Sequence, residues 1–203
     1  GWYMVKSGLT DRTDVSHYRL SLHLTIAFII FILLLWNFLR YNNFNKTDSH
    51  FKIPFILLNT FLFLIIIQIS LGALVSGLDA GQIYQTWPLM DNSYFPDDSS
   101  LDDLFKKGVF ENPSLVQFIH RNVAYFIIIL FSLIFLITFS NKNFIYLRKS
   151  VIYVLIALLF QLILGILTIL SGAQILLASM HQIGSIFLIA AVLVLVFKNS
   201  KTN

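Results

Sequence analysis

The sequence has 203 residues, of which 57% are hydrophobic and only 12% are charged. This composition excludes an ordinary soluble domain, in which about a quarter of the residues are charged. There is no cysteine, so disulfides and cysteine-ligated metal sites are excluded as well. The net charge of +4 comes from residues between apolar stretches, where it indicates membrane topology rather than binding to nucleic acid.

Four stretches without Asp, Glu, Lys or Arg are long enough to cross a bilayer as a helix, which takes about 20 residues. They are residues 20–39, 53–78, 122–141 and 150–197. The last stretch has 48 residues and predicts two helices joined by a tight turn near residues 171–174. None of the four alternates polar and apolar residues as a membrane barrel strand does. We therefore predict an all-α polytopic membrane protein with five transmembrane helices in this chain.

The charges between these helices predict the orientation of the chain. Basic residues gather after the first and third helices and in the C-terminal tail: Arg40, Lys46, Lys52, Lys142, Arg148, Lys149, Lys198 and Lys201. Residues 79–111, between the second and third helices, are acidic, with seven carboxylates against two lysines. Short basic loops are retained on the cytoplasmic side. We expect the C-terminus in the cytoplasm or matrix and the acidic segment outside.

Three histidines lie about one to two turns inside predicted helices, near the outer face: His23, His120 and His181. Ionisable side chains are costly within a bilayer and are often functional there. Hydrogen bonding to a neighbouring helix is the alternative for each of them. Two facing histidines in an apolar bundle suit heme iron, whereas zinc usually needs more ligands and the spans contain no carboxylate. Arg121 follows His120, and Arg19 lies one turn before His23, so each could pair with heme propionates.

Weak internal similarity suggests a duplicated bundle, although chance similarity among Leu-, Ile- and Gly-rich helices is an alternative. The matching positions are Gly165, Ser171 and Gly172 with Gly1, Ser7 and Gly8, and Gln161 and Gly165 with Gln68 and Gly72. Under duplication, residues 1–50 are the remnant of an N-terminal half: the end of a third helix, an outer loop and a fourth helix. Residues 51–203 are then a complete C-terminal four-helix half that contains both His120 and His181.

Several segments, in order along nearly the whole chain, together resemble the heme A synthase family in its cysteine-free mitochondrial and alphaproteobacterial form. They read GWYMVKSGL, SHYRLSLHL, LGALVSGLDAGQIYQTWPLM, FIHR and LILGILTILSGAQILLASMHQIGS. The resemblance implies an eight-helix bundle of two pseudo-symmetric four-helix halves. It also implies an oxidoreductase that converts the C8 methyl group of heme O to the formyl group of heme A for cytochrome oxidase. The location implied is the bacterial inner membrane or the mitochondrial inner membrane.

The same resemblance assigns residues. It implies that His120 and His181 ligate the iron of a heme b cofactor, with Arg121 beside it. It implies that His23 ligates the iron of the substrate heme, with Arg19 nearby. The family's catalytic glutamate belongs to an EYIHR-like motif that this sequence does not contain, which predicts a chain shortened at its N-terminus.

The partners implied are heme O and the lipid bilayer. Binding to heme O synthase or to oxidase-assembly factors, and assembly into a homo-oligomer, are further possibilities that the resemblance leaves undecided. Two other classes of function remain open on the residues alone. One is a bis-histidine b-type membrane cytochrome that acts only as an electron carrier. The other is a heme-free transporter or assembly anchor whose histidines pack helices together.

Overall fold

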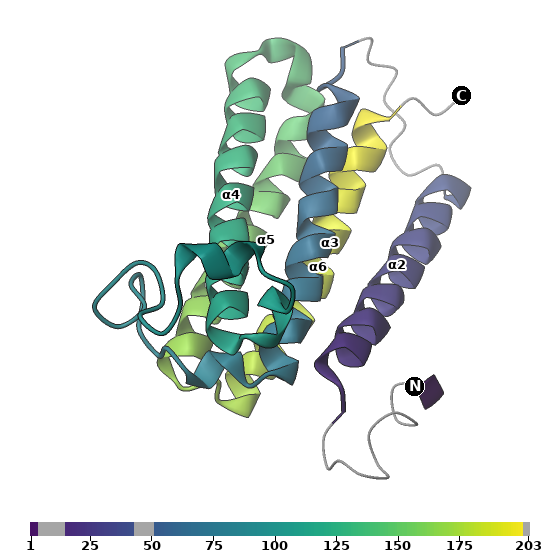
Figure 1. The fold of residues 1–203 in the computed structure, drawn as a ribbon. Coiled ribbons are helices and arrows are strands. Elements are labelled where there is room, and N and C mark those ends of the chain that lie inside the picture. Colours follow the sequence, from purple (N-terminus) through teal and green to yellow (C-terminus); the bar gives the residue numbers. More distant parts are fainter. Residues whose placement is uncertain (4–14, 43–50, 201–203) are drawn as a thin grey trace.

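The computed structural model describes residues 1–3, 15–42 and 51–200 (Figure 1). These residues form an all-helical structure with five helices long and apolar enough to cross a membrane, as predicted. The helices are α2 (His17–Tyr41), α3 (Phe55–Gly77), α4 (Pro113–Ser140), α5 (Ile145–Leu170) and α6 (Ile175–Asn199). The predicted turn at residues 171–174 joins α5 to α6, with Gly172 and Ala173 at positive φ. Most of the repeat at residues 1–8, and the predicted boundary near residue 50, lie outside the described residues.

Helices α3, α4, α5 and α6 form a four-helix bundle, in which each packs against the next and α6 returns to α3. Helix α2 packs on the outside of this bundle, against α3 and α6 (Figure 1). The connection between α3 and α4, residues 78–112, lies across one end of the bundle, called here the loop end (Figure 1). Helices α2, α4 and α6 begin at the loop end, whereas α3 and α5 begin at the opposite end.

Helix α4 begins nine residues before the charge-free stretch 122–141 from which it was predicted. Pro113 occupies the first turn, where its missing N–H costs nothing. The Asn112 side chain caps the helix by accepting hydrogen bonds from the backbone N–H groups of Ser114 (2.9 Å) and Leu115 (3.2 Å). The helix therefore carries Arg121 within it, and this buried guanidinium is compensated by hydrogen bonds to the loop.

The well-packed apolar core lies in the half of the bundle farther from the loop end. Its fully buried members include Phe61, Ile65, Ile134, Val151, Val154, Ile189, Val192 and Leu195. Large apolar side chains on the outside of the helices are exposed, such as Leu34 of α2, Ile163 of α5 and Phe187 of α6. An outer surface of this kind matches lipid rather than water, in agreement with the predicted membrane spans.

Two sets of polar contacts fix the helices at the end opposite the loop. Asn199 pairs with both backbone groups of Ile53: its Oδ1 accepts from the backbone N–H at 2.9 Å and its Nδ2 donates to the carbonyl at 2.9 Å. Both residues are buried. Arg148 of α5 donates to the carbonyls of Thr138 (3.4 Å) and Phe139 (3.0 Å) at the end of α4. These contacts join the start of α3 to the end of α6, and α4 to α5.

Helix α2 lies very close to α3 at the loop end. A Cβ atom on Gly77 would lie 2.8 Å from Cα of His17, so only glycine fits there. One to two turns further along, Ser21 donates to the Ser70 carbonyl at 2.8 Å, and the hydroxyls of Thr25 and Ser70 lie 2.7 Å apart. Small residues and hydroxyl hydrogen bonds are the usual means of joining helices within a bilayer.

Candidate functional site

The three membrane histidines lie at one depth. His23, His120 and His181 are the seventh, eighth and seventh residues of α2, α4 and α6, which all begin at the loop end. At about 1.5 Å rise per residue, each lies roughly 10 Å along its helix. His120 and His181 come from α4 and α6, which are separated around the bundle by α3 on one side and α5 on the other.

His120 is held by two residues of α3 that are four positions apart. The amide nitrogen of Gln68 lies 3.1 Å from the backbone carbonyl oxygen of His120 and 3.2 Å from its Nε2 atom. A Cβ atom on Gly72 would lie 3.3 Å from Cε1 of the same ring. The Nδ1 atom of His120 is buried and has no hydrogen-bond partner.

His181 has a corresponding pair of neighbours on α5, again four positions apart. A Cβ atom on Gly165 would lie 3.1 Å from Cε1 of His181. Gln161 is buried and packs against Gly184 of α6. A Cβ atom on Gly184 would lie 2.0 Å from Nε2 of Gln161. As in His120, the Nδ1 atom of His181 is buried without a partner. The Gln–Gly spacing seen in the sequence thus recurs in space, with each glycine against the imidazole of a neighbouring helix.

Buried polar atoms without partners concentrate in the half of the structure near the loop end. Among the described residues, nine side-chain nitrogen or oxygen atoms are buried and unpartnered, and only that of Ser150 belongs to the opposite half. The other eight are in His17, Gln68, Gln117, His120, Arg121, Tyr125, Gln161 and His181. An unpartnered buried polar group costs about 1–3 kcal/mol. Such a concentration is typical of a site that receives a ligand or water.

Arg121 is directed to the loop rather than along the helix. Its Nη2 donates to the Tyr84 carbonyl at 3.0 Å and its Nη1 to the Leu89 carbonyl at 3.2 Å. Gln117, one turn earlier, donates to the same Tyr84 carbonyl at 3.0 Å. Burial raises the pKa of the Tyr84 phenol, and the nearby Asp98 adds to this effect. The sequence predicted a functional role for Arg121 but none for Gln117. Their spacing of four residues, which places both on one face of a helix, was the available signal.

His23 and Arg19 contact the first residues of the chain. The backbone nitrogen of Gly1 lies 3.3 Å from Nδ1 of His23, and the His23 side chain is exposed. Arg19 donates to the Tyr3 carbonyl at 3.2 Å, and its guanidinium carbon lies 4.5 Å from the centre of the Tyr3 ring. The two predicted substrate residues thus share one face of α2, and both contact residues 1–3.

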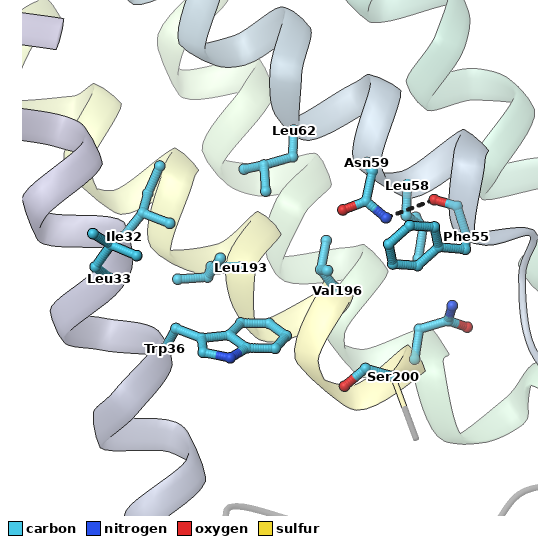
Figure 2. A pocket seen from close by; sticks show the side chains of 11 residues that line it. Ile32, Leu33, Trp36, Phe55, Leu58, Asn59, Leu62, Leu193, Val196 and Ser200 are labelled. Carbon is cyan, nitrogen blue, oxygen red and sulfur yellow. Dashed lines mark hydrogen bonds between the residues drawn. The ribbon is translucent and has the colours of Figure 1, made fainter. Parts of the chain in front are cut away.

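Two cavities border α2. One, of about 430 Å³, lies between α2 and α6 and is lined by residues that include Phe28, Gln182 and Ile186. The other, of about 390 Å³, lies between α2, α3 and α6, near the end opposite the loop. Figure 2 shows that Trp36 and Leu62 face it from two sides, with Leu193 and Val196 of α6 between them. Both are predominantly apolar, and neither is lined by His120 or His181.

No cluster of three or more His, Cys, Asp or Glu side chains occurs in the part of the chain that the structure describes. The donor set nearest to a metal site is therefore the pair of imidazoles on α4 and α6. Two imidazoles are sufficient for the axial positions of heme iron. Each ring keeps one buried nitrogen, Nδ1, without a hydrogen-bond partner, and each packs against a glycine of the neighbouring helix.

Comparison with known proteins agrees with this chemistry. A family model, COX15-CtaA, described as a cytochrome oxidase assembly protein, matches residues 1–193. The chain is 45% identical, over 98% of its length, to a protein of Pelagibacter ubique (strain HTCC1062) named heme A synthase. It is 38% identical over 95% of its length to a protein of that name from Rickettsia rickettsii (strain Sheila Smith), and 41% identical over 93% to one from Wolbachia pipientis wMel.

The chain spans 58%, 58% and 52% of the lengths of these three relatives. No solved structure matches the chain.

Proposed function

Because this chain belongs to the COX15-CtaA family of cytochrome oxidase assembly proteins, we propose that the protein is a heme A synthase. It would oxidise the C8 methyl group of heme O to a formyl group. The observation that carries the proposal is the pair of imidazoles, His120 and His181, in a half-bundle rich in buried unpartnered polar atoms. The relatives named heme A synthase favour this enzyme over a protein that only carries electrons.

In this proposal His120 and His181 hold a heme b through its iron, which supplies a redox-active centre within the bundle. Gly72 and Gly165 allow each imidazole to pack closely against the neighbouring helix, since a Cβ atom at either position would crowd Cε1 of the ring. Arg121 adds positive charge next to His120, on the loop side where anionic propionates would be solvated.

We propose that His23 and Arg19 take the substrate heme. Two observations support this role: His23 has the same depth as the other two histidines, and Arg19 lies one turn closer to the loop end. The separate location on α2 supports two heme sites rather than one, because His23 lies outside the four-helix bundle.

We also propose that α3–α6 are one four-helix half of an eight-helix bundle and that α2 belongs to the other half, with the boundary near residue 50. The spacing of Gly1, Ser7 and Gly8, which matches that of Gly165, Ser171 and Gly172, supports the duplication. The basic residues Arg40, Lys142, Arg148 and Lys149 at the end opposite the loop support a C-terminus in the cytoplasm or matrix, and the acidic loop outside. The inner membrane is the expected location, and heme O synthase and oxidase-assembly factors are the expected partners.

The proposal is tested in a bacterial strain that lacks its own heme A synthase but still makes heme O. Expression of the natural protein that carries this sequence is expected to restore heme A, measured by chromatography of extracted hemes. The variant His23→Ala should abolish conversion. Unchanged heme O with a normal level of folded, heme-loaded protein would contradict the enzyme assignment and leave electron transfer as the function.

A further inference from the structure

Three side chains on one face of α4 each keep a buried polar atom without a hydrogen-bond partner. These atoms are Oε1 of Gln117, Nε of Arg121 and the hydroxyl oxygen of Tyr125. The three positions are four residues apart, so they follow one side of the helix. Gln117 and Arg121 are almost fully buried, with 1% and 6% of their surface exposed. The column of unpartnered atoms starts under the loop and runs along α4 away from it.

The side-chain ends of Gln117 and Arg121 meet at one oxygen atom. Nε2 of Gln117 and Nη2 of Arg121 each donate to the Tyr84 carbonyl at 3.0 Å. A backbone carbonyl oxygen can only accept a hydrogen bond, so Gln117 must present its NH₂ group to it. Oε1 of Gln117 is therefore an acceptor left without a donor, and Nε of Arg121 is a donor left without an acceptor.

The Tyr125 side chain extends toward these two groups. Side chains of an α-helix lean toward its N-terminus, so the Tyr125 ring leans from α4 back toward Arg121 and the loop end. Its hydroxyl group can both donate and accept a hydrogen bond. This face of α4 therefore offers an acceptor, a donor and a group that is both.

Arg121 has the greatest need of a further partner, because its guanidinium is a buried cation. In the part of the chain that the structure describes, the ion pair found joins Lys106 to Asp103, and no carboxylate pairs with Arg121. The two hydrogen bonds of Arg121 go to neutral carbonyls. A buried charge is costly unless it is paired or fully hydrogen-bonded, so a bound partner at Nε is expected.

We propose that this face of α4 binds a small cluster of water molecules through Gln117, Arg121 and Tyr125. Water both donates and accepts, so it satisfies Oε1 of Gln117 and Nε of Arg121 together. A carboxylate or phosphate group would satisfy Arg121 but would place a second acceptor against Oε1 of Gln117. Internal waters typically make about three hydrogen bonds to buried polar groups that lack other partners. The cluster hydrates the guanidinium within the fold.

The test is radiolytic hydroxyl labelling of the protein in lipid nanodiscs, without added heme, read residue by residue by mass spectrometry. Hydroxyl radicals form from water where it lies, so a buried ring is modified only where water is bound next to it. We expect Tyr125 to be modified, whereas Phe131, in the apolar core of the same helix, stays unmodified. In Tyr125→Phe the rate at this ring should fall about fivefold, the factor that one ordinary hydrogen bond gives.

Ser132→Ala is the matched control, because the Ser132 hydroxyl is also on α4 but donates to the Ile128 carbonyl of its own helix (2.8 Å). It should leave the rate at Tyr125 unchanged. An unmodified Tyr125 in the parent, or an equal rate in Tyr125→Phe, would overturn the inference.

A second measurement needs no variant at position 125. In ¹⁵N-arginine-labelled parent, magnetisation should pass from water to the Nε–H of Arg121, whose NMR signal is identified by its loss in Arg121→Lys. Absence of this transfer would equally contradict bound water at Arg121. Neither readout involves heme, so the result is independent of the proposed function.

Discussion

Gly165 and His181 are in direct contact across the interface of α5 and α6, so that a Cβ atom on Gly165 would lie 3.1 Å from Cε1 of the His181 ring. Gly72 has the same relationship to His120, at 3.3 Å. Both contacts are tighter than an added methyl group normally tolerates. The two glycines therefore set the position of the imidazoles that we assign to heme.

The first prediction follows from this contact. Gly165→Ala should displace the His181 ring by a few tenths of an ångström, whereas Gly165→Leu should remove the ring from its place and abolish low-spin heme. Overpacking of this kind costs about 1–3 kcal/mol, so unfolding should be monitored together with the optical spectrum. Ile163→Leu, on the exposed face of the same helix, is the control and should preserve both. A low-spin spectrum of normal intensity in Gly165→Leu would refute the proposed position of His181.

The second prediction concerns the end of the bundle opposite the loop. Asn199→Leu removes both hydrogen bonds to the buried backbone of Ile53 and should destabilise the fold by about 1–3 kcal/mol for each group left unpaired. Thermal unfolding in detergent measures the loss. Asn59→Leu is the matched control, because the Asn59 side chain donates to the Phe55 carbonyl of its own helix (2.7 Å) and so joins no two helices through this bond. Equal effects of the two substitutions would show that the Asn199 pair does not lock the helices.

Much of the fold could be predicted from the sequence because the bilayer imposes a simple rule on it. Uncharged stretches of sufficient length gave all five helices and the turn at residues 171–174. The rule misplaced the start of α4, because it treats Arg121 as a boundary. In the structure this arginine lies inside the helix, since two loop carbonyls accept its hydrogen bonds.

The site was predictable only in part. Counting along each helix predicts that His23, His120 and His181 lie at one depth, and the helix bounds agree with this, whereas their roles stay predictions. The contact of Asn199 with Ile53 joins residues 146 positions apart, and no local pattern indicates it. Gln117 and Gln68 each donate to a backbone carbonyl of another segment, that of Tyr84 and that of His120. These partners are known only once the helices are packed together.

The third prediction concerns the attachment of the loop. Arg121→Leu and Gln117→Leu should each loosen the loop around Tyr84, because its carbonyl loses a buried donor. Limited proteolysis and amide hydrogen exchange of residues 84–111 should both become faster. Arg148→Leu is the control, since Arg148 also donates to two carbonyls but at the opposite end of the bundle. Loop protection that is unchanged in Arg121→Leu would contradict this account of the arginine.

The fourth prediction is a pH dependence in the loop. A hydrogen bond from Lys106 (2.7 Å), together with those from the backbone N–H and hydroxyl of Ser100, holds the pKa of Asp103 well below its usual range. A carboxylate with a depressed pKa stabilises the folded loop above its unfolded pKa, near 3.8, and this contribution is lost as the pH falls toward the folded value. Protection of the Ser100 amide against hydrogen exchange should therefore decrease only in strongly acidic buffer.

In Asp103→Asn this protection should be reduced at neutral pH and should lose its acid dependence. Asp102, which is next to it on the short helix η2 (Leu101–Phe105), provides the matched variant Asp102→Asn. An acid dependence that persists in Asp103→Asn would assign the effect to another carboxylate of the loop.

The measurement that tests the central claim most directly is the reduced optical spectrum of the purified chain supplied with heme, beside His120→Ala and His181→Ala. The account predicts a low-spin b-type spectrum in the parent that is lost in either variant, while His23→Ala retains it. A spectrum that survives removal of His120 or His181, or a parent that stays colourless with its helical content intact, would contradict the assignment of these two histidines to heme.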